Sequence, residues 1–176
     1  MNVAIIGCGG IGCLHARAYQ TMPDVKVAYM IDINRDLADR AAKEFGAVPL
    51  YSADDLSEMP DIVDVVTPPG AHTALTLRFV EQGIPVFCEK PLTTDIEEAR
   101  AVVSAADRYG VPVGIGFKMR NEAIFKAAKE NIGRVGTLYA VSTVKNQPHH
   151  ADTKEHWIAK TGCMYELSVH EYDLIE

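Results

Sequence analysis

The glycines near the start of the chain have the spacing of a loop that binds phosphate. Residues 7–12 read GCGGIG, the pattern G-x-G-x-x-G, between a short apolar run and a helical pattern. Such loops place free N–H groups and the positive end of a helix dipole against a pyrophosphate. Glycine-rich turns also serve as plain connectors, so the motif needs a second feature. The predicted cofactor contacts in this loop are Gly7, Gly9, Gly10, Ile11 and Gly12.

An acidic residue supplies that second feature. Asp32 closes the second apolar run, twenty residues beyond Gly12, where a carboxylate can accept both hydroxyls of an adenosine ribose. Its charge would repel a 2′-phosphate, so NAD is favoured over NADP. Arg35 is a complication, because an arginine nearby could accommodate that phosphate. The alternative for Asp32 is a plain helix N-cap.

Two more apolar runs end in turns that could complete the site. Residues 67–72 read TPPGAH, and residues 89–91 read EKP. Pro91 disfavours a helical backbone at Lys90, so this lysine could donate to a substrate hydroxyl or to the nicotinamide amide. The alternative is a solvated surface lysine. The additional predicted cofactor contacts are Thr67, Pro68, His72, Glu89 and Lys90.

A third cluster lies near the end of the chain. Glu166, His170 and Asp173 are spaced by four and three residues, which puts all three on one face of a helix. A histidine between carboxylates can be oriented and tuned for proton transfer near neutral pH. A solvated helix face or a structural ion pair would give the same pattern.

These residues need a scaffold, and the apolar pattern predicts one. Short runs rich in β-branched residues alternate with helical patterns, and continuous apolar runs suit parallel strands that are covered on both faces. Thr94 and Glu97 have the spacing of a helix capping box. We therefore expect an α/β fold, a Rossmann doubly wound parallel sheet. The predicted strands are Val3–Ile6, Val25–Ile31, Ile62–Val66, Pro85–Cys88 and Val111–Ile115.

The pattern changes after Gly116. Residues 121–131 read as a helix, residues 137–144 as a longer strand, and residues 164–176 as a helix again. We expect a dinucleotide-binding domain over residues 1–118. Residues 119–176 would then begin an α+β substrate-binding and oligomerisation domain.

Composition limits the class of protein. The chain has 176 residues, of which 48% are apolar, and a net charge of −7 from 17 basic and 24 acidic side chains. This balance argues against nucleic acid and anionic membranes as partners. The four cysteines have no zinc or redox spacing, and the N-terminus carries no basic leader, so a cytoplasmic protein is expected. His149, His150 and His156 lack metal-ligand spacing and fit an exposed or substrate-contacting loop better.

Taken together, the motifs resemble the Gfo/Idh/MocA oxidoreductase family, which includes inositol and sugar dehydrogenases. The resemblance rests on Gly7 to Gly12 with His15 following, Asp32, the Thr67-Pro68-Pro69 turn with His72, Glu89-Lys90-Pro91, and the final helix. These motifs occur in family order along the whole chain. Relatives of this family are longer, so the resemblance also implies a C-terminal domain that is truncated here.

The resemblance implies roles for three catalytic residues. Lys90 matches a lysine that positions substrate and nicotinamide, and His170 matches the histidine that exchanges a proton with the reacting hydroxyl or carbonyl. Glu166 stands where many inositol dehydrogenase-like members have Asp, which affects substrate identity. The implied reaction is NAD(H)-dependent hydride transfer on a sugar, inositol or related polyol by a homo-oligomer without a metal. The alternatives are a non-catalytic NAD-binding fragment or regulator, or an NAD-dependent glycosidase.

Overall fold

The protein consists of two compact units. A computed structural model describes residues 1–144, 162, 164–165 and 168–175. The first unit comprises Met1–Gly116 and the second Phe117–Glu176, so the division falls two residues before the expected boundary at residue 118. Each unit is described by itself.

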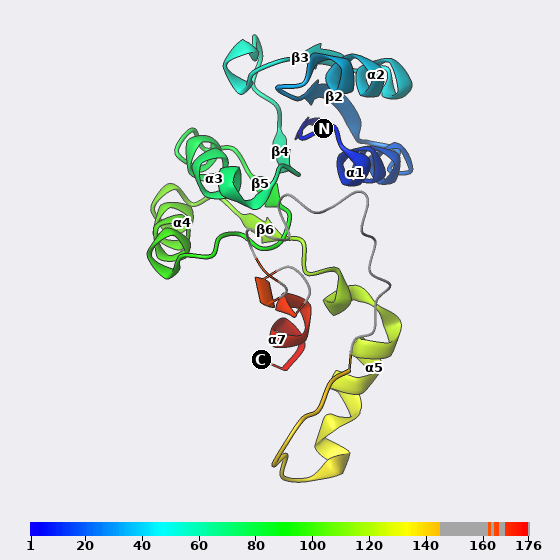
Figure 1. Ribbon diagram of the computed structural model, residues 1–176, viewed down its shortest axis with the longest axis vertical. Helices are drawn as coiled ribbons and strands as arrows, with labels where there is room; N and C mark the ends of the chain where they lie inside the picture. The colour runs from blue at the N-terminus through cyan, green and yellow to red at the C-terminus, as the bar shows by residue number, and fades with distance from the viewer. Residues whose placement is uncertain (145–161, 163, 166–167, 176) are drawn as a thin grey trace. The chain divides into compact units, whose positions relative to one another are not determined.

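The first unit is built on a parallel sheet of six strands (Figure 1). The strand order is β3-β2-β1-β4-β5-β6, and every neighbouring pair is parallel. This order is that of a dinucleotide-binding doubly wound fold, so the predicted fold class is confirmed. The apolar pattern does not predict strand β3, which has only three residues and contains Pro49. The strands are β1 Asn2–Ile6, β2 Lys26–Ile31, β3 Val48–Leu50, β4 Ile62–Val65, β5 Val86–Cys88 and β6 Val113–Ile115.

Helices cover both faces of this sheet. In Figure 1, α1 and α2 lie to the right of the strands, and α3 and α4 lie to the left. Alternate residues of β1 accordingly enter separate cores: Val3 and Ile5 pack with Ala16 and Ala38, whereas Ala4 and Ile6 pack in the core that contains Phe79. The helices are α1 Gly10–Gln20, α2 Arg35–Phe45, α3 His72–Val80 and α4 Ile96–Tyr109, with single turns of 3-10 helix at η1 Ala53–Asp55 and η2 Pro69–Ala71.

The N-terminal cap of α4 differs from the sequence prediction. Asp95, not Thr94, is the cap, and its Oδ1 accepts hydrogen bonds from the N–H groups of Glu97 and Glu98 at 2.7 and 3.2 Å. A carboxylate in this place also interacts favourably with the positive end of the helix dipole. The predicted capping box at Thr94 was therefore wrong by one residue.

All the regular secondary structure in the described part of the second unit is helical. It contains η3 Lys118–Asn121, α5 Ala123–Asn131, η4 Ile132–Val135 and α7 Val169–Ile175. The helix expected over residues 121–131 is confirmed by α5. Residues 137–144, predicted as a strand, form no strand and are exposed. A strand is stabilised by a hydrogen-bonded neighbour, and the described residues of this unit offer none.

The predicted C-terminal helix is shorter than expected. Residues 162, 164 and 165 are helical, Ser168 is in a turn, and α7 begins at Val169. Glu166 lies outside the described residues, so its place relative to His170 stays a prediction. None of the helices in the described ranges combines the length and the apolar character needed to cross a membrane.

Candidate functional site

The loop between β1 and α1 can be formed only with glycine at its first position. Gly7 has a φ of +107°, a region that side chains disfavour. A Cβ there would also lie 2.5 Å from the carbonyl oxygen of Val66. The Gly7 N–H donates to the carbonyl oxygen of Ile31 at 2.8 Å. These contacts join the loop to the ends of β2 and β4.

The other glycines of the loop differ in how much space surrounds them. A Cβ on Gly12 would lie 1.9 Å from the carbonyl oxygen of Gly7, whereas a Cβ on Gly9 or Gly10 would meet nothing within 4 Å. Gly9 caps α1 without a side-chain hydrogen bond, so the N–H groups of the first turn are available to a ligand. Ile11, on this turn, is half exposed. The start of α1 is thus open at Gly9 and Gly10, and pyrophosphate binding there stays a prediction.

Asp32 is tied to this loop. Its Oδ2 accepts from the Cys8 N–H and its Oδ1 from the Asn34 N–H, both at 2.8 Å. Asn34, not Asp32, caps α2, so the alternative of a plain N-cap is wrong. Each carboxylate oxygen can accept a further hydrogen bond, which leaves capacity for ribose hydroxyls. The Arg35 guanidinium lies 4.4 Å from the centre of the Tyr51 ring.

The turn after β4 is held by a buried histidine. His72 is 1% exposed; its Nε2 lies 2.6 Å from the Thr67 carbonyl oxygen and its Nδ1 2.7 Å from the Pro91 carbonyl oxygen. Both ring nitrogens are therefore occupied by backbone. His72 links the turn that contains Thr67 and Pro68 to the turn after β5, and a direct cofactor contact by its ring nitrogens would require one of these bonds to break.

The turn after β5 lies at the same edge of the sheet. The Glu89 N–H donates to the Val65 carbonyl oxygen at 2.9 Å, and the Lys90 N–H donates to Oε2 of Glu89 at 3.1 Å. The Lys90–Pro91 peptide bond is cis. The carboxyl ends of parallel strands are where ligands bind to such sheets. The structure thus gathers the glycine loop, Asp32, the Thr67 turn and Lys90 at one edge.

Three side chains that no sequence motif connects, His15, Asp64 and Glu89, form a charged cluster. Asp64, on β4, is fully buried, and its Oδ2 lies 2.9 Å from Nδ1 of His15. Nε2 of His15 lies 3.4 Å from Oε1 of Glu89. Asp64 is the one charged residue in the apolar run Ile62–Val66. A carboxylate in a buried strand needs a partner of opposite charge or a hydrogen-bond donor. Its presence in this run could therefore have indicated a buried pair.

The groups in this cluster shift the pKa values of one another. Burial by itself would lower the pKa of His15, but its hydrogen bonds to Asp64 and Glu89 outweigh that effect and raise the pKa from 6.5 to about 9. Burial by itself would raise the pKa of Glu89, and the hydrogen bond with His15 brings it below its usual value. His15 is therefore a cation near neutral pH.

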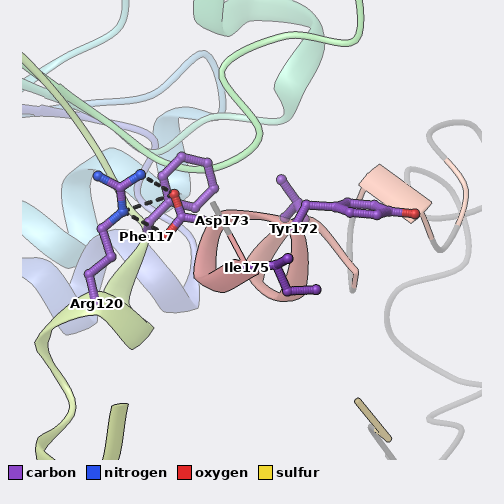
Figure 2. A pocket seen from close by; sticks show the side chains of 6 residues that line it. Phe117, Arg120, Tyr172, Asp173 and Ile175 are labelled. Atoms are coloured by element: carbon purple, nitrogen blue, oxygen red, sulfur yellow. Dashed lines mark hydrogen bonds and ion pairs between the residues drawn. The ribbon is translucent and has the colours of Figure 1, made fainter. Parts of the chain in front are cut away.

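In the second unit, the residues predicted for proton transfer lie on α7. His170 is buried and meets the Phe117 ring edge-on, with ring centres 6.2 Å apart. Asp173 pairs with Arg120: Nε of Arg120 donates to Oδ2 at 2.7 Å and to Oδ1 at 2.9 Å, and NH2 also donates to Oδ1. This forked ion pair (Figure 2) was one of the alternatives for the cluster.

A hollow of about 510 Å³ opens beside this ion pair. Figure 2 shows Arg120 and Asp173 at one side of it and the side chains of Tyr172 and Ile175 along α7. His170 is not among the residues that line it: Phe117, Arg120, Val169, Tyr172, Asp173 and Ile175. The hollow is thus distinct from the predicted proton-transfer group.

Cysteine and metal chemistry receive no support in the described residues. Burial raises the pKa of Cys8 and of Cys88 to about 12, as expected for small apolar side chains. No group of three His, Cys, Asp or Glu side chains in the described part of the chain is placed to hold a metal ion. His149, His150, His156 and Cys163 lie outside the described residues.

Residues 1–117 match the sequence model of the Gfo/Idh/MocA family, described as an oxidoreductase family with an NAD-binding Rossmann fold. The chain is 27% identical over 177 residues to inositol 2-dehydrogenase from Rhizobium meliloti, covering 99% of this chain and 53% of that protein. It is 30% identical to scyllo-inositol 2-dehydrogenase (NAD(+)) from Bacillus subtilis, covering 99% of this chain and 52% of that protein.

The structural comparison agrees with the sequence comparison. A myo-inositol dehydrogenase from Corynebacterium glutamicum matches with a TM-score of 0.81 and 26% identity, covering 99% of this chain and 54% of that one. The chain therefore spans about half the length of the relatives that it matches.

Proposed function

Because this chain belongs to the Gfo/Idh/MocA family of oxidoreductases with an NAD-binding Rossmann fold, we propose that it functions in NAD(H)-dependent hydride transfer. The substrate would be a sugar, inositol or related polyol with a hydroxyl or carbonyl at the reacting carbon. The observation that carries the proposal is one sheet edge with both an open glycine loop and the Glu89-Lys90 turn. The names of the relatives supply the substrate class.

Two features would hold the cofactor. The N–H groups at the start of α1 would bind the pyrophosphate, and Asp32 would accept hydrogen bonds from the adenosine ribose. The negative charge of Asp32 disfavours a 2′-phosphate, and the stacking of Arg35 on Tyr51 gives that arginine another partner. NAD is therefore preferred to NADP. When bound, NAD supplies hydride transfer at C4 of its nicotinamide ring.

The side chains of this protein would position the substrate and transfer one proton. Lys90, at the cofactor edge, would donate to the reacting oxygen and stabilise the negative charge that develops there. His170 would take the hydroxyl proton during oxidation and return it during reduction. Glu166 would orient the substrate or this histidine.

The test is reduced-cofactor absorbance when the purified chain is offered NAD and a panel of inositols and sugars. We expect turnover with at least one polyol, and its loss in Lys90→Ala and in His170→Ala. Arg17→Gln, which removes an exposed ion pair with Glu44, is the matched control and keeps full activity. Undiminished turnover in both site variants would refute the assigned roles.

A second function is favoured by one observation, the coverage of only about half of each relative. In this alternative the chain binds NAD as a regulator and turns nothing over. Calorimetric NAD binding together with a negative substrate screen would support it, whereas turnover by this chain would exclude it.

We also propose that the chain forms a homo-oligomer in the cytoplasm. Several large apolar side chains between residues 124 and 144 are exposed, among them Ile124, Val135, Tyr139 and Val144, and such surface is typical of an interface. Light scattering coupled to size exclusion should give a mass above the 19.2 kDa of one chain. A strictly monomeric mass would refute the oligomer.

A further inference from the structure

Asp64 has a carboxylate that is fully buried within the sheet. It lies on the central strand β4, opposite Ile5 of β1 and Phe87 of β5 in the sheet register. Its side chain is 0% exposed. A buried charge is costly unless it is paired and hydrogen-bonded. His15 pairs with this carboxylate, with its Nδ1 2.9 Å from Oδ2 of Asp64.

His15 is held on several sides. It comes from α1, the helix that the glycine loop begins, and its side chain is only 18% exposed. Nδ1 faces Asp64 at 2.9 Å and Nε2 faces Glu89 at 3.4 Å. The ring also meets Phe87 edge-on, with centres 5.9 Å apart. In this orientation of the imidazole, each ring nitrogen faces a carboxylate.

The carboxylate of Glu89 contacts both His15 and the backbone of Lys90. Oε1 of Glu89 faces His15, and Oε2 accepts the Lys90 N–H at 3.1 Å. Gly116 leaves the space that the carboxylate fills, because a Cβ there would lie 2.6 Å from Oε1. A continuous chain of contacts thus runs from Asp64 through His15 and Glu89 to the backbone of Lys90.

We propose that His15 is a positioning residue that bridges Asp64 and Glu89 and thereby holds Lys90 at the cofactor edge of the sheet. Since His15 belongs to the helix that follows the glycine loop, it couples the phosphate-binding loop to the predicted catalytic lysine. The inference rests on the proposed function, because the position of Lys90 affects a reaction only if Lys90 contacts substrate or nicotinamide.

The charge of His15 is essential to this role. A protonated ring donates from both nitrogens, whereas a neutral ring can donate to only one of the two carboxylates. The pKa of about 9 keeps both bonds in place at neutral pH. The titratable groups that face this cluster from the neighbouring elements are Tyr19 on α1, Asp64 on β4, Cys88 on β5, and Glu89 and Lys90 in the turn after it.

The experiment follows the Lys90 and Gly116 backbone amides of the full chain by NMR from pH 6 to pH 10.5. In the wild type, both amide shifts should move with the midpoint of the His15 ring, about 9. In His15→Gln that step should disappear. Arg17→Gln, an exposed substitution on the same helix, should keep it. A Lys90 amide with the same titration in His15→Gln as in the wild type would overturn the proposal.

A second variant covers a failure of His15→Gln to fold. Glu89→Gln keeps the His15–Asp64 pair and removes the negative charge that faces Nε2 of His15. The midpoint of His15 should therefore fall, and the Lys90 amide should stop following it. An unchanged His15 midpoint would also overturn the proposal.

NAD affinity, measured by calorimetry on the same samples, separates this inference from the proposed function. We expect the affinity of His15→Gln to stay within about threefold of the wild type, while kcat on the polyol substrate falls at least tenfold. Absence of NAD binding to the wild type would refute the proposed function, whereas normal NAD binding with an unchanged Lys90 amide and kcat in His15→Gln would refute the inference alone.

Discussion

Replacing Gly12 by alanine should destabilise the first unit because of one contact. The added Cβ would lie 1.9 Å from the carbonyl oxygen of Gly7, and the gap must open by about 1 Å before the contact is tolerable. Overpacking costs about 1–3 kcal/mol. The obstacle is a main-chain carbonyl that cannot rotate away, so the upper end applies. The better helix propensity of alanine returns up to about 1 kcal/mol.

The net loss in the free energy of unfolding is therefore about 2 kcal/mol, which lowers the melting temperature of a unit of this size by roughly 6–12 °C. Thermal and urea unfolding, followed by circular dichroism, measure the change. Gly9→Ala is the matched control: it is the same substitution in the same loop, but its Cβ meets nothing within 4 Å. If Gly12→Ala unfolded within about 0.5 kcal/mol of Gly9→Ala, the close packing of helix on loop would be refuted.

Three further predictions concern charge. Asp32→Asn should weaken NAD binding at least tenfold in calorimetry, since hydrogen bonds to a charged group contribute about 1.5–3 kcal/mol each, and NADP should lose less. The raised pKa of His15 should contribute on the order of 3 kcal/mol to stability; this contribution is fully present below pH 6.5 and is lost as the pH rises through about 9. Urea unfolding across this range should therefore show a decline that His15→Gln lacks. Arg120→Gln should leave the Asp173 carboxylate without its forked partner, at a cost of about 1–3 kcal/mol, and hydrogen exchange should report faster opening of α7.

The sheet and its edge were predictable because local signals agree with the global fold. Apolar runs of β-branched residues that alternate with helical patterns are typical of a parallel sheet that is covered on both faces. The glycine pattern and Asp32 have fixed places in that arrangement. The structure adds the reason for two glycines, since Gly7 and Gly12 are each confined by a nearby carbonyl oxygen.

The remainder depends on contacts between residues far apart in the sequence. His15, Asp64 and Glu89 come from three different elements, and no spacing along the chain reveals that they meet. The cap at Asp95 was missed because Thr94 has the right spacing and the adjacent Asp is an equally good cap. The residues 137–144 have strand composition, but strand formation also requires a pairing partner, which composition does not encode.

The central claim is that the glycine loop holds the pyrophosphate of NAD. Isothermal titration of NAD into the wild type and into Gly9→Ala tests it most directly, because the alanine methyl group enters the open space beside the loop without disturbing the fold. We expect the wild type to bind one NAD per chain, and Gly9→Ala to bind at least tenfold more weakly with an unchanged unfolding midpoint. Equal affinity in the two proteins, or no binding by the wild type, would contradict the account.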